Sequence, residues 1–104
     1  MGLDYRVKCC PDGLVTDRRR RIKVLDCTVR DGGICNDFQF EHALVRRVFD
    51  SLVAAGIDTM EVGYRTGPGV FDRDKLGPWR FCDPEDLAKA VEPGRIQLTT
   101  MVDI

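Results

Sequence analysis

The chain has 104 residues, of which 43% are hydrophobic and 32% are charged, and its formal net charge is −1. This composition is typical of a globular protein with one core, and the near-neutral charge excludes a global attraction for nucleic acid or anionic membranes. No run approaches the roughly 20 apolar residues of a membrane span, and the first residues lack the apolar stretch of a signal peptide. We therefore predict a protein that binds neither nucleic acid nor membranes.

The chain has five cysteines at irregular spacing. An odd number argues against a disulfide framework, and reduced thiols are typical of the cytoplasm, which is the compartment we predict. Cys9 and Cys10 could form half of a metal site, but no second Cys or His pair completes it.

The first 20 residues are predicted to form a separate arm. The stretches "YRVKCC" and "GLVT" flank Pro11-Asp12-Gly13, which is a turn signal, so we expect a short β-hairpin within residues 1–20. The basic run that starts at Arg18 is interpreted as a solvated approach to the first strand, and a phosphate patch is the alternative.

A regular alternation of strand and helix patterns follows in residues 21–104. Short, apolar, β-branched runs predict strands at 21–29, 57–65 and 95–104. Apolar residues three or four positions apart, among them Ala43, Leu44, Val48 and Leu52, predict a helix at 40–56 with one buried stripe.

Polar and turn-forming residues predict where the helices start. Asn36 and Asp37 are expected to cap the 40–56 helix. The Gly- and Pro-rich segment 66–82 predicts a long loop, in which Trp79 packs over the rim of the fold. Asp83-Pro84 then opens a second helix that continues through residues 85–91.

Strands that alternate with helices imply a parallel sheet with right-handed crossovers. Two architectures fit, a doubly wound sheet and part of a (β/α)₈ TIM barrel. A dinucleotide-binding sheet would carry G-x-G-x-x-G after its first strand, whereas this chain has "RDGG" there. Since a whole barrel needs about 250 residues, residues 21–104 would be roughly its first third.

Ionisable side chains follow each predicted strand. They are Arg30 and Asp31 at the end of the first strand, Glu61 on the second, Tyr64 and Arg65 at its end, and Asp103 near the end of the third. Both architectures place functional groups at the carboxyl ends of strands, and neighbouring strands lie about 4.8 Å apart. We therefore expect Arg30, Asp31 and Glu61 to converge in one pocket.

The residue types in this group suggest a chemistry. The carboxylate of Asp31 is a hard ligand for Mg²⁺ or Mn²⁺. Arg30 can bind a carboxylate or stabilise an enolate oxygen, and Glu61 can orient that arginine or transfer protons. Gly32 allows backbone to approach a ligand closely. The structural alternative is that Arg30 and Asp31 form an ion pair that fixes a loop, while Glu61 only neutralises Arg30.

Two motifs carry a family resemblance. "DCTVRDG" at residues 26–32, followed by "IDTMEVGYR", resembles the HMG-CoA lyase-like superfamily, or DRE-TIM metallolyases, whose first strand ends in D-x-T-L-R-D-G. "RDGGICNDFQF" is most similar to the 4-hydroxy-2-oxovalerate aldolase-type branch. The resemblance covers about residues 21–104. It implies the first units of a divalent-metal TIM barrel that makes or breaks C–C bonds through an enolate.

The resemblance also implies roles for single residues. Arg30 corresponds to the enolate-stabilising arginine, Asp31 to the metal-binding aspartate, and Glu61 to the glutamate of the second strand. The chain departs from the family at Ile34, where the oxovalerate aldolases carry a histidine base. The family's H-x-H metal ligands also have no counterpart, since the one histidine is His42, which we predict to be structural or solvent-facing.

From the resemblance we predict the N-terminal part of an aldolase or lyase that acts on a 2-oxo acid such as pyruvate with Mn²⁺ or Mg²⁺. Gly32, Tyr64 and Arg65 are expected to contact the substrate. The alternatives are a Claisen-type acyltransferase that uses acetyl-CoA on the same barrel and a truncated, non-catalytic chain that binds a partner. The edge of the third strand is expected to pair with the rest of the barrel or within a homo-oligomer.

Overall fold

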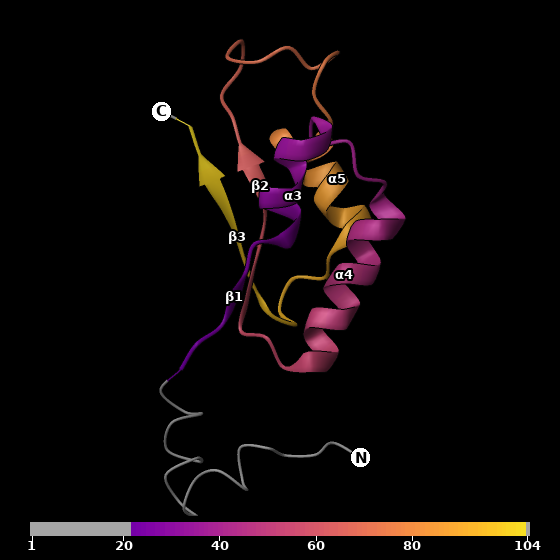
Figure 1. The fold of residues 1–104 in the computed structure, drawn as a ribbon, viewed down its shortest axis with the longest axis vertical. Helices are drawn as coiled ribbons and strands as arrows, with labels where there is room; N and C mark the ends of the chain where they lie inside the picture. Colours follow the sequence, from indigo (N-terminus) through magenta and orange to yellow (C-terminus); the bar gives the residue numbers. More distant parts are fainter. Residues whose placement is uncertain (1–21, 104) are drawn as a thin grey trace, which may run out of the picture.

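The computed structural model describes residues 22–103, so the hairpin predicted within residues 1–20 lies outside the described residues. Three parallel strands form one sheet in the order β1-β2-β3. They are β1 (Leu25–Asp26), β2 (Thr59–Arg65) and β3 (Gln97–Val102), and Figure 1 shows them side by side. The predicted α/β class with a parallel sheet is confirmed, while the TIM barrel stays a prediction.

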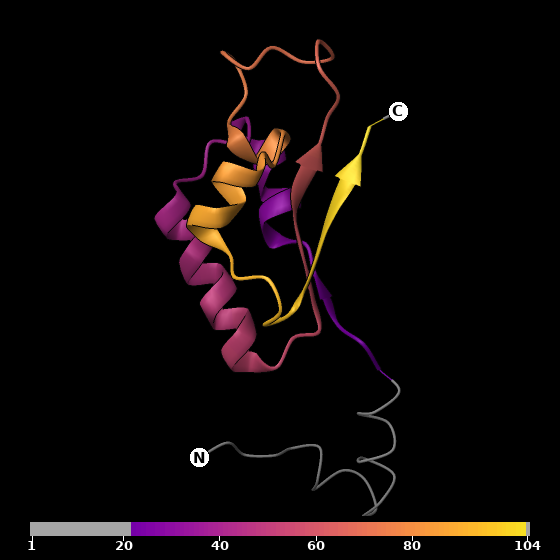
Figure 2. The ribbon, with the colours of Figure 1, turned by 180° about the vertical axis from the view of Figure 1, so that it is seen from behind.

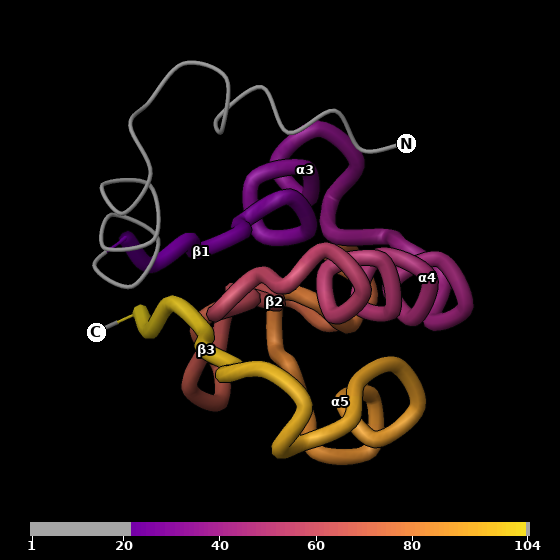
Figure 3. Tube along the Cα trace, turned by 90° about the horizontal axis from the view of Figure 1, so that it is seen from below, coloured from indigo at the N-terminus to yellow at the C-terminus, as the bar shows by residue number. Residues whose placement is uncertain are grey.

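Four helical segments accompany the strands: α3 (Thr28–Asn36), α4 (His42–Ala55), the 3₁₀ helix η1 (Pro78–Arg80) and α5 (Pro84–Ala90). Figures 1 and 2 show the helices on one side of the strands. In Figure 3, seen from below, α4 and α5 lie on the same side of the sheet, and no helix of residues 22–103 covers the opposite face. None of the described helices is long and apolar enough to cross a membrane.

The first predicted strand is much shorter than expected. Of residues 21–29, only Leu25 and Asp26 form a strand, and the chain is helical from Thr28 onward. The carboxylate of Asp26 accepts hydrogen bonds from Thr28 N at 3.1 Å and from Thr28 Oγ1 at 2.7 Å. Such local bonds compete with strand pairing and favour a turn into a helix. Arg30 and Asp31 therefore lie in the first turn of α3, and the prediction that they end a strand was wrong.

Helix α4 confirms the helix predicted at 40–56, but its buried stripe is displaced. Val45 and Phe49 are 0% exposed and lie at the centre of the core. Val48 and Leu52 pack against them as predicted, whereas Leu44 is 38% exposed. The buried stripe is therefore centred on Val45 and Phe49, and not on Leu44 as the spacing had indicated.

Two further boundaries differ from the predictions. Asp37 ends α3 in a left-handed conformation (φ 55°), and the residue that precedes α4 is Glu41, so Asn36 and Asp37 do not cap α4. Within the predicted loop at 66–82, the structure adds η1, whose Trp79 is 0% exposed and donates from Nε1 to Phe40 O at 2.8 Å. Trp79 is therefore a core residue. The helix after Asp83-Pro84 and the third strand are confirmed.

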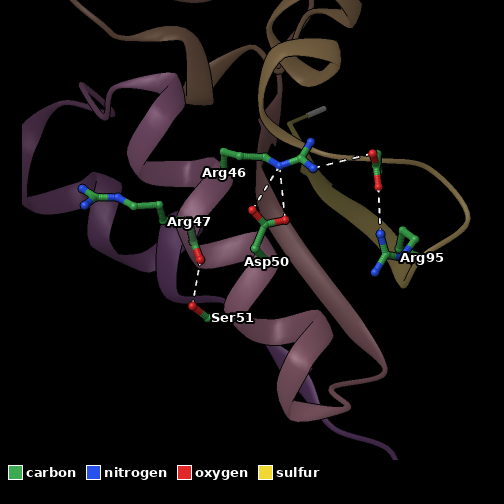
Figure 4. Close-up of polar contacts among 6 residues, drawn as sticks. Arg46, Arg47, Asp50, Ser51 and Arg95 are labelled. Atoms are coloured by element: carbon green, nitrogen blue, oxygen red, sulfur yellow. Dashed lines mark hydrogen bonds and ion pairs between the residues drawn. The ribbon is translucent and has the colours of Figure 1, made fainter.

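A charged network on the surface joins α4 to the segment between α5 and β3 (Figure 4). The Nε atom of Arg46 lies 3.2 Å from Asp50 Oδ1, and its Nη2 atom lies 3.6 Å from Glu92 Oε1. The Nη1 atom of Arg95 lies 3.0 Å from Oε2 of the same glutamate. Exposed ion pairs of this kind contribute about 0–1 kcal/mol each. The side chain of Arg47 points away from this network (Figure 4), so Arg47 can serve below as a control position for arginine substitutions.

Gly63 tests the packing of β2 against η1. A Cβ atom at this position would overlap the backbone oxygen of Trp79, and the Sγ atom of Cys82 lies close by. Because backbone cannot yield as a flexible side chain does, Gly63→Ala is expected to lower the free energy of unfolding by about 1–3 kcal/mol in urea titrations. Gly67→Ala is the matched control, since its Cβ would meet only a methyl group of Val70 at 4.0 Å. Equal stability of the two variants would contradict this packing.

Candidate functional site

Three of the predicted site residues come together where α3 meets β2. The Nε atom of Arg30 donates to Glu61 Oε1 at 2.6 Å, and its Nη1 atom lies 2.7 Å from Asp31 Oδ1. The side chains of Arg30 and Glu61 are 22% and 12% exposed, whereas that of Asp31 is 57% exposed. The ion pair between Arg30 and Glu61 is therefore the inner part of the group, and Asp31 faces solvent.

An irregularity in β2 adds Tyr64 to this group. Glu61 lies opposite Thr99, but Gly63 lies opposite Thr100, which directly follows Thr99. This shift is a β-bulge that places Gly63 on the other face from Glu61 and returns Tyr64 to the face of Glu61. Hydrogen bonds to Glu61, and then to Tyr64, raise the pKa of Arg30 above its ordinary value. The guanidinium is therefore a fixed cation held by both side chains.

The structure places the other two predicted substrate contacts differently. Gly32 lies in α3, where an added Cβ would be 3.1 Å from the ring of Phe40, so the missing side chain makes room for a ring of the protein itself. Arg65 is exposed at the end of β2. Its charge contributes to lowering the pKa of Asp83, after the larger effect of a hydrogen bond from Arg73. The contact of Arg65 with substrate stays a prediction.

A second charged group, which was not predicted as a unit, borders Tyr64. Arg80 is 7% exposed, and its Nη2 atom lies 2.8 Å from Asp103 Oδ2. The Thr66 hydroxyl lies 2.7 Å from the same carboxylate oxygen. The Cζ atom of Arg80 lies 4.0 Å from the ring centroid of Tyr64 and 4.2 Å from that of Phe71. Tyr64 therefore stacks on the guanidinium of Arg80 and lies close enough to Arg30 to affect its pKa.

The described residues do not form a metal site by themselves. Residues 22–103 contain no group of three or more His, Cys, Asp or Glu side chains that could hold a metal ion. The carboxylate of Asp31 is shared between Arg30 and the Cys27 thiol, which lies 3.3 Å from Oδ2. His42 is bound to Asp86 at 2.7 Å and lies edge-on to Trp79, so its predicted structural role is confirmed.

Comparison with known proteins gives one informative match. No family model matches the chain, and no solved structure matches it. The chain is 45% identical over 72 residues to a protein from Mycobacterium tuberculosis (strain ATCC 25618 / H37Rv) named oxaloacetate decarboxylase. The match covers 69% of this chain and 21% of that protein, so the chain spans about a fifth of the length of this curated relative. Since oxaloacetate is a 2-oxo acid, the match is consistent with the predicted likeness to 2-oxo acid lyases.

The pKa of Asp103 gives a test of the second charged group. The hydrogen bond from Thr66, followed by the contacts with Arg80, lowers this pKa below its ordinary value of 3.8. A lowered pKa stabilises the fold above the ordinary value, and this contribution is lost as the pH falls through the folded-state pKa. The free energy of unfolding should therefore fall below pH 3.8 less steeply in Asp103→Asn than in the wild type.

The control for this experiment is Asp74→Asn, because the carboxylate of Asp74 is exposed and forms no ion pair in the part of the chain that the structure describes. Chemical unfolding at a series of pH values supplies the curves. Identical slopes in the wild type and Asp103→Asn would show that Asp103 is not held by Arg80 and Thr66 in solution.

Proposed function

We propose that the chain is the N-terminal part of a carbon–carbon lyase that acts on a 2-oxo acid through an enolate. The observation that carries the proposal is the guanidinium of Arg30, which is partly buried and fixed by Glu61 at 2.6 Å. A cation that is held in place before the reaction stabilises developing negative charge without reorganisation. The name of the M. tuberculosis relative supports the same substrate class.

Arg30 has donors left for a substrate. A guanidinium carries five N–H groups, and one is used by Glu61 and one by Asp31. A remaining N–H can donate to the 2-oxo oxygen of a bound substrate. In a decarboxylation the C3–C4 bond would break, CO₂ would leave, and the electron pair would pass to the C2 oxygen as an enolate. Arg30 would stabilise that oxygen until a proton reaches C3 and completes the product.

Glu61 acts in this proposal as a positioning residue. Its carboxylate accepts the hydrogen bond from Arg30 Nε, and its side chain is only 12% exposed. An arginine holds its proton at every accessible pH, so Glu61 always faces a cation, and this bond fixes the plane of the guanidinium. Of the two roles that the sequence left open for Glu61, orientation of Arg30 fits the geometry better than proton transfer.

The remaining features of the proposal concern the metal and the complete fold. Asp31 is proposed as one ligand of Mn²⁺ or Mg²⁺, which when bound would polarise the 2-oxo group. The other ligands of the metal would come from outside residues 22–103.

We also propose that the three parallel strands are the first units of a TIM barrel. All-parallel sheets are normally covered on both faces, whereas one face of this sheet has no helix in the described residues (Figure 3).

Replacement of Arg30 tests this function. Arg30→Lys keeps the positive charge but loses the planar donors that bind Glu61 and the substrate at the same time. With oxaloacetate and Mn²⁺, pyruvate formation by the wild-type protein should exceed the rate with Mn²⁺ alone. The substitution should reduce this excess about 100-fold, as the loss of one oxyanion donor does elsewhere.

Arg47→Lys is the matched control for Arg30→Lys, because Arg47 is exposed and is not part of the group formed by Arg30, Asp31 and Glu61. It should retain the wild-type rate. In a protein that also supplies the metal ligands outside residues 22–103, no rate above that of Mn²⁺ alone, or equal rates in the Arg30 and Arg47 variants, would refute the proposed function.

A further inference from the structure

Arg80 has a hydrogen-bonding group that nothing in the described chain satisfies. Its Nη2 atom binds Asp103 at 2.8 Å, but its Nη1 atom is enclosed and has no hydrogen-bond partner among residues 22–103. A buried N–H group without an acceptor costs free energy, and such groups are uncommon in folded proteins. The free edge of Arg80 therefore points to an acceptor that binds there.

The aromatic rings around Arg80 do not take the place of this acceptor. Its Cζ atom lies over the rings of Tyr64 and Phe71, at 4.0 Å and 4.2 Å from their centroids. Rings stacked in this way contact the flat faces of a guanidinium. The N–H groups lie in the plane of the guanidinium, so Nη1 is directed out between the rings. An acceptor in that plane, such as a carboxylate oxygen, would make a charge-assisted hydrogen bond to this free edge.

The free edge of Arg80 belongs to the same region as the group that holds Arg30. The ring of Tyr64 stacks on Arg80, and Tyr64 is also close enough to Arg30 to raise the pKa of that arginine, after the larger effect of Glu61. Two guanidinium groups therefore lie near one tyrosine at the carboxyl end of β2. One of them is suited to an oxo group that becomes an enolate, and the other to an adjacent carboxylate. A 2-oxo acid carries these two groups on neighbouring carbon atoms.

Phe71 partly covers Arg80 from an exposed loop. This residue is 40% exposed and belongs to the loop at 67–75, in which every residue is exposed. Figure 1 shows the segment after β2 extending past the upper end of the sheet. Movement of the Phe71 ring would uncover the face of the Arg80 guanidinium on which this ring now stacks.

We propose that Arg80 binds the 1-carboxylate of a 2-oxo acid through Nη1, and that Phe71 is the lid of this subsite. This inference rests on the proposed function, since it assigns the carboxylate of the same substrate whose oxo group faces Arg30. Arg80 would then be a substrate-binding residue that selects charged 2-oxo acids over their neutral analogues.

The test compares pyruvate with its neutral amide, pyruvamide, in the presence of Mn²⁺. One charge-assisted hydrogen bond should make pyruvate bind about 10- to 100-fold more tightly than pyruvamide. Arg80→Lys, which keeps the charge but not the planar edge, should lose most of that preference, and Arg47→Lys should keep it. Arginine-selective NMR of the wild-type protein should show the Nη resonances of Arg80 shifting with pyruvate but not with pyruvamide.

The wild-type NMR titration decides the question even if Arg80→Lys fails to fold. Unshifted Arg80 resonances at saturating pyruvate, or an unchanged preference in a folded Arg80→Lys variant, would overturn the inference and leave the lyase function standing. An Arg80-dependent preference for pyruvate, combined with no loss of turnover in Arg30→Lys, would support this subsite while refuting the proposed reaction.

Discussion

The ion pair between Arg30 and Glu61 is the interaction on which the site depends. It joins α3 to β2 across 31 positions of sequence, and both side chains are largely shielded from solvent. Shielding strengthens the attraction, but an uncompensated charge left after removal of either partner would be costly. The pair thus fixes the plane of the guanidinium before any substrate arrives, which is the condition for electrostatic stabilisation of an enolate.

Tyr64 extends this arrangement from one arginine to two. The β-bulge after Glu61 brings Tyr64 back to the face of that glutamate, where its side chain meets both Arg30 and Arg80. The same irregularity turns Gly63 toward Trp79, so one local shift in β2 serves both the core and the site. Bulges commonly re-aim side chains near functional groups, and here the effect is to place two cationic groups around one ring.

The sequence allowed a good part of the fold and of the Arg30 group to be predicted, because periodic apolar patterns and the "RDGG" and "EVG" motifs are local signals. The helix that begins at Thr28 could not be read from "CTV", since it depends on the two hydrogen bonds to Asp26. The burial of Val45 in place of Leu44 depends on how α4 is rotated against the sheet. Arg80 lies in a Gly- and Pro-rich segment without periodicity, and only the path of the folded chain brings it to Tyr64.

The central claim is that the fixed Arg30 guanidinium stabilises an enolate, and exchange of the methyl protons of pyruvate tests it most directly. In D₂O with Mn²⁺, ¹H NMR follows the loss of the pyruvate methyl signal, which reports enolate formation without any C–C bond cleavage. Exchange should be faster than with Mn²⁺ alone, and it should return to that background rate when Arg30 is replaced by Lys. Exchange at the background rate in the wild-type protein would contradict it.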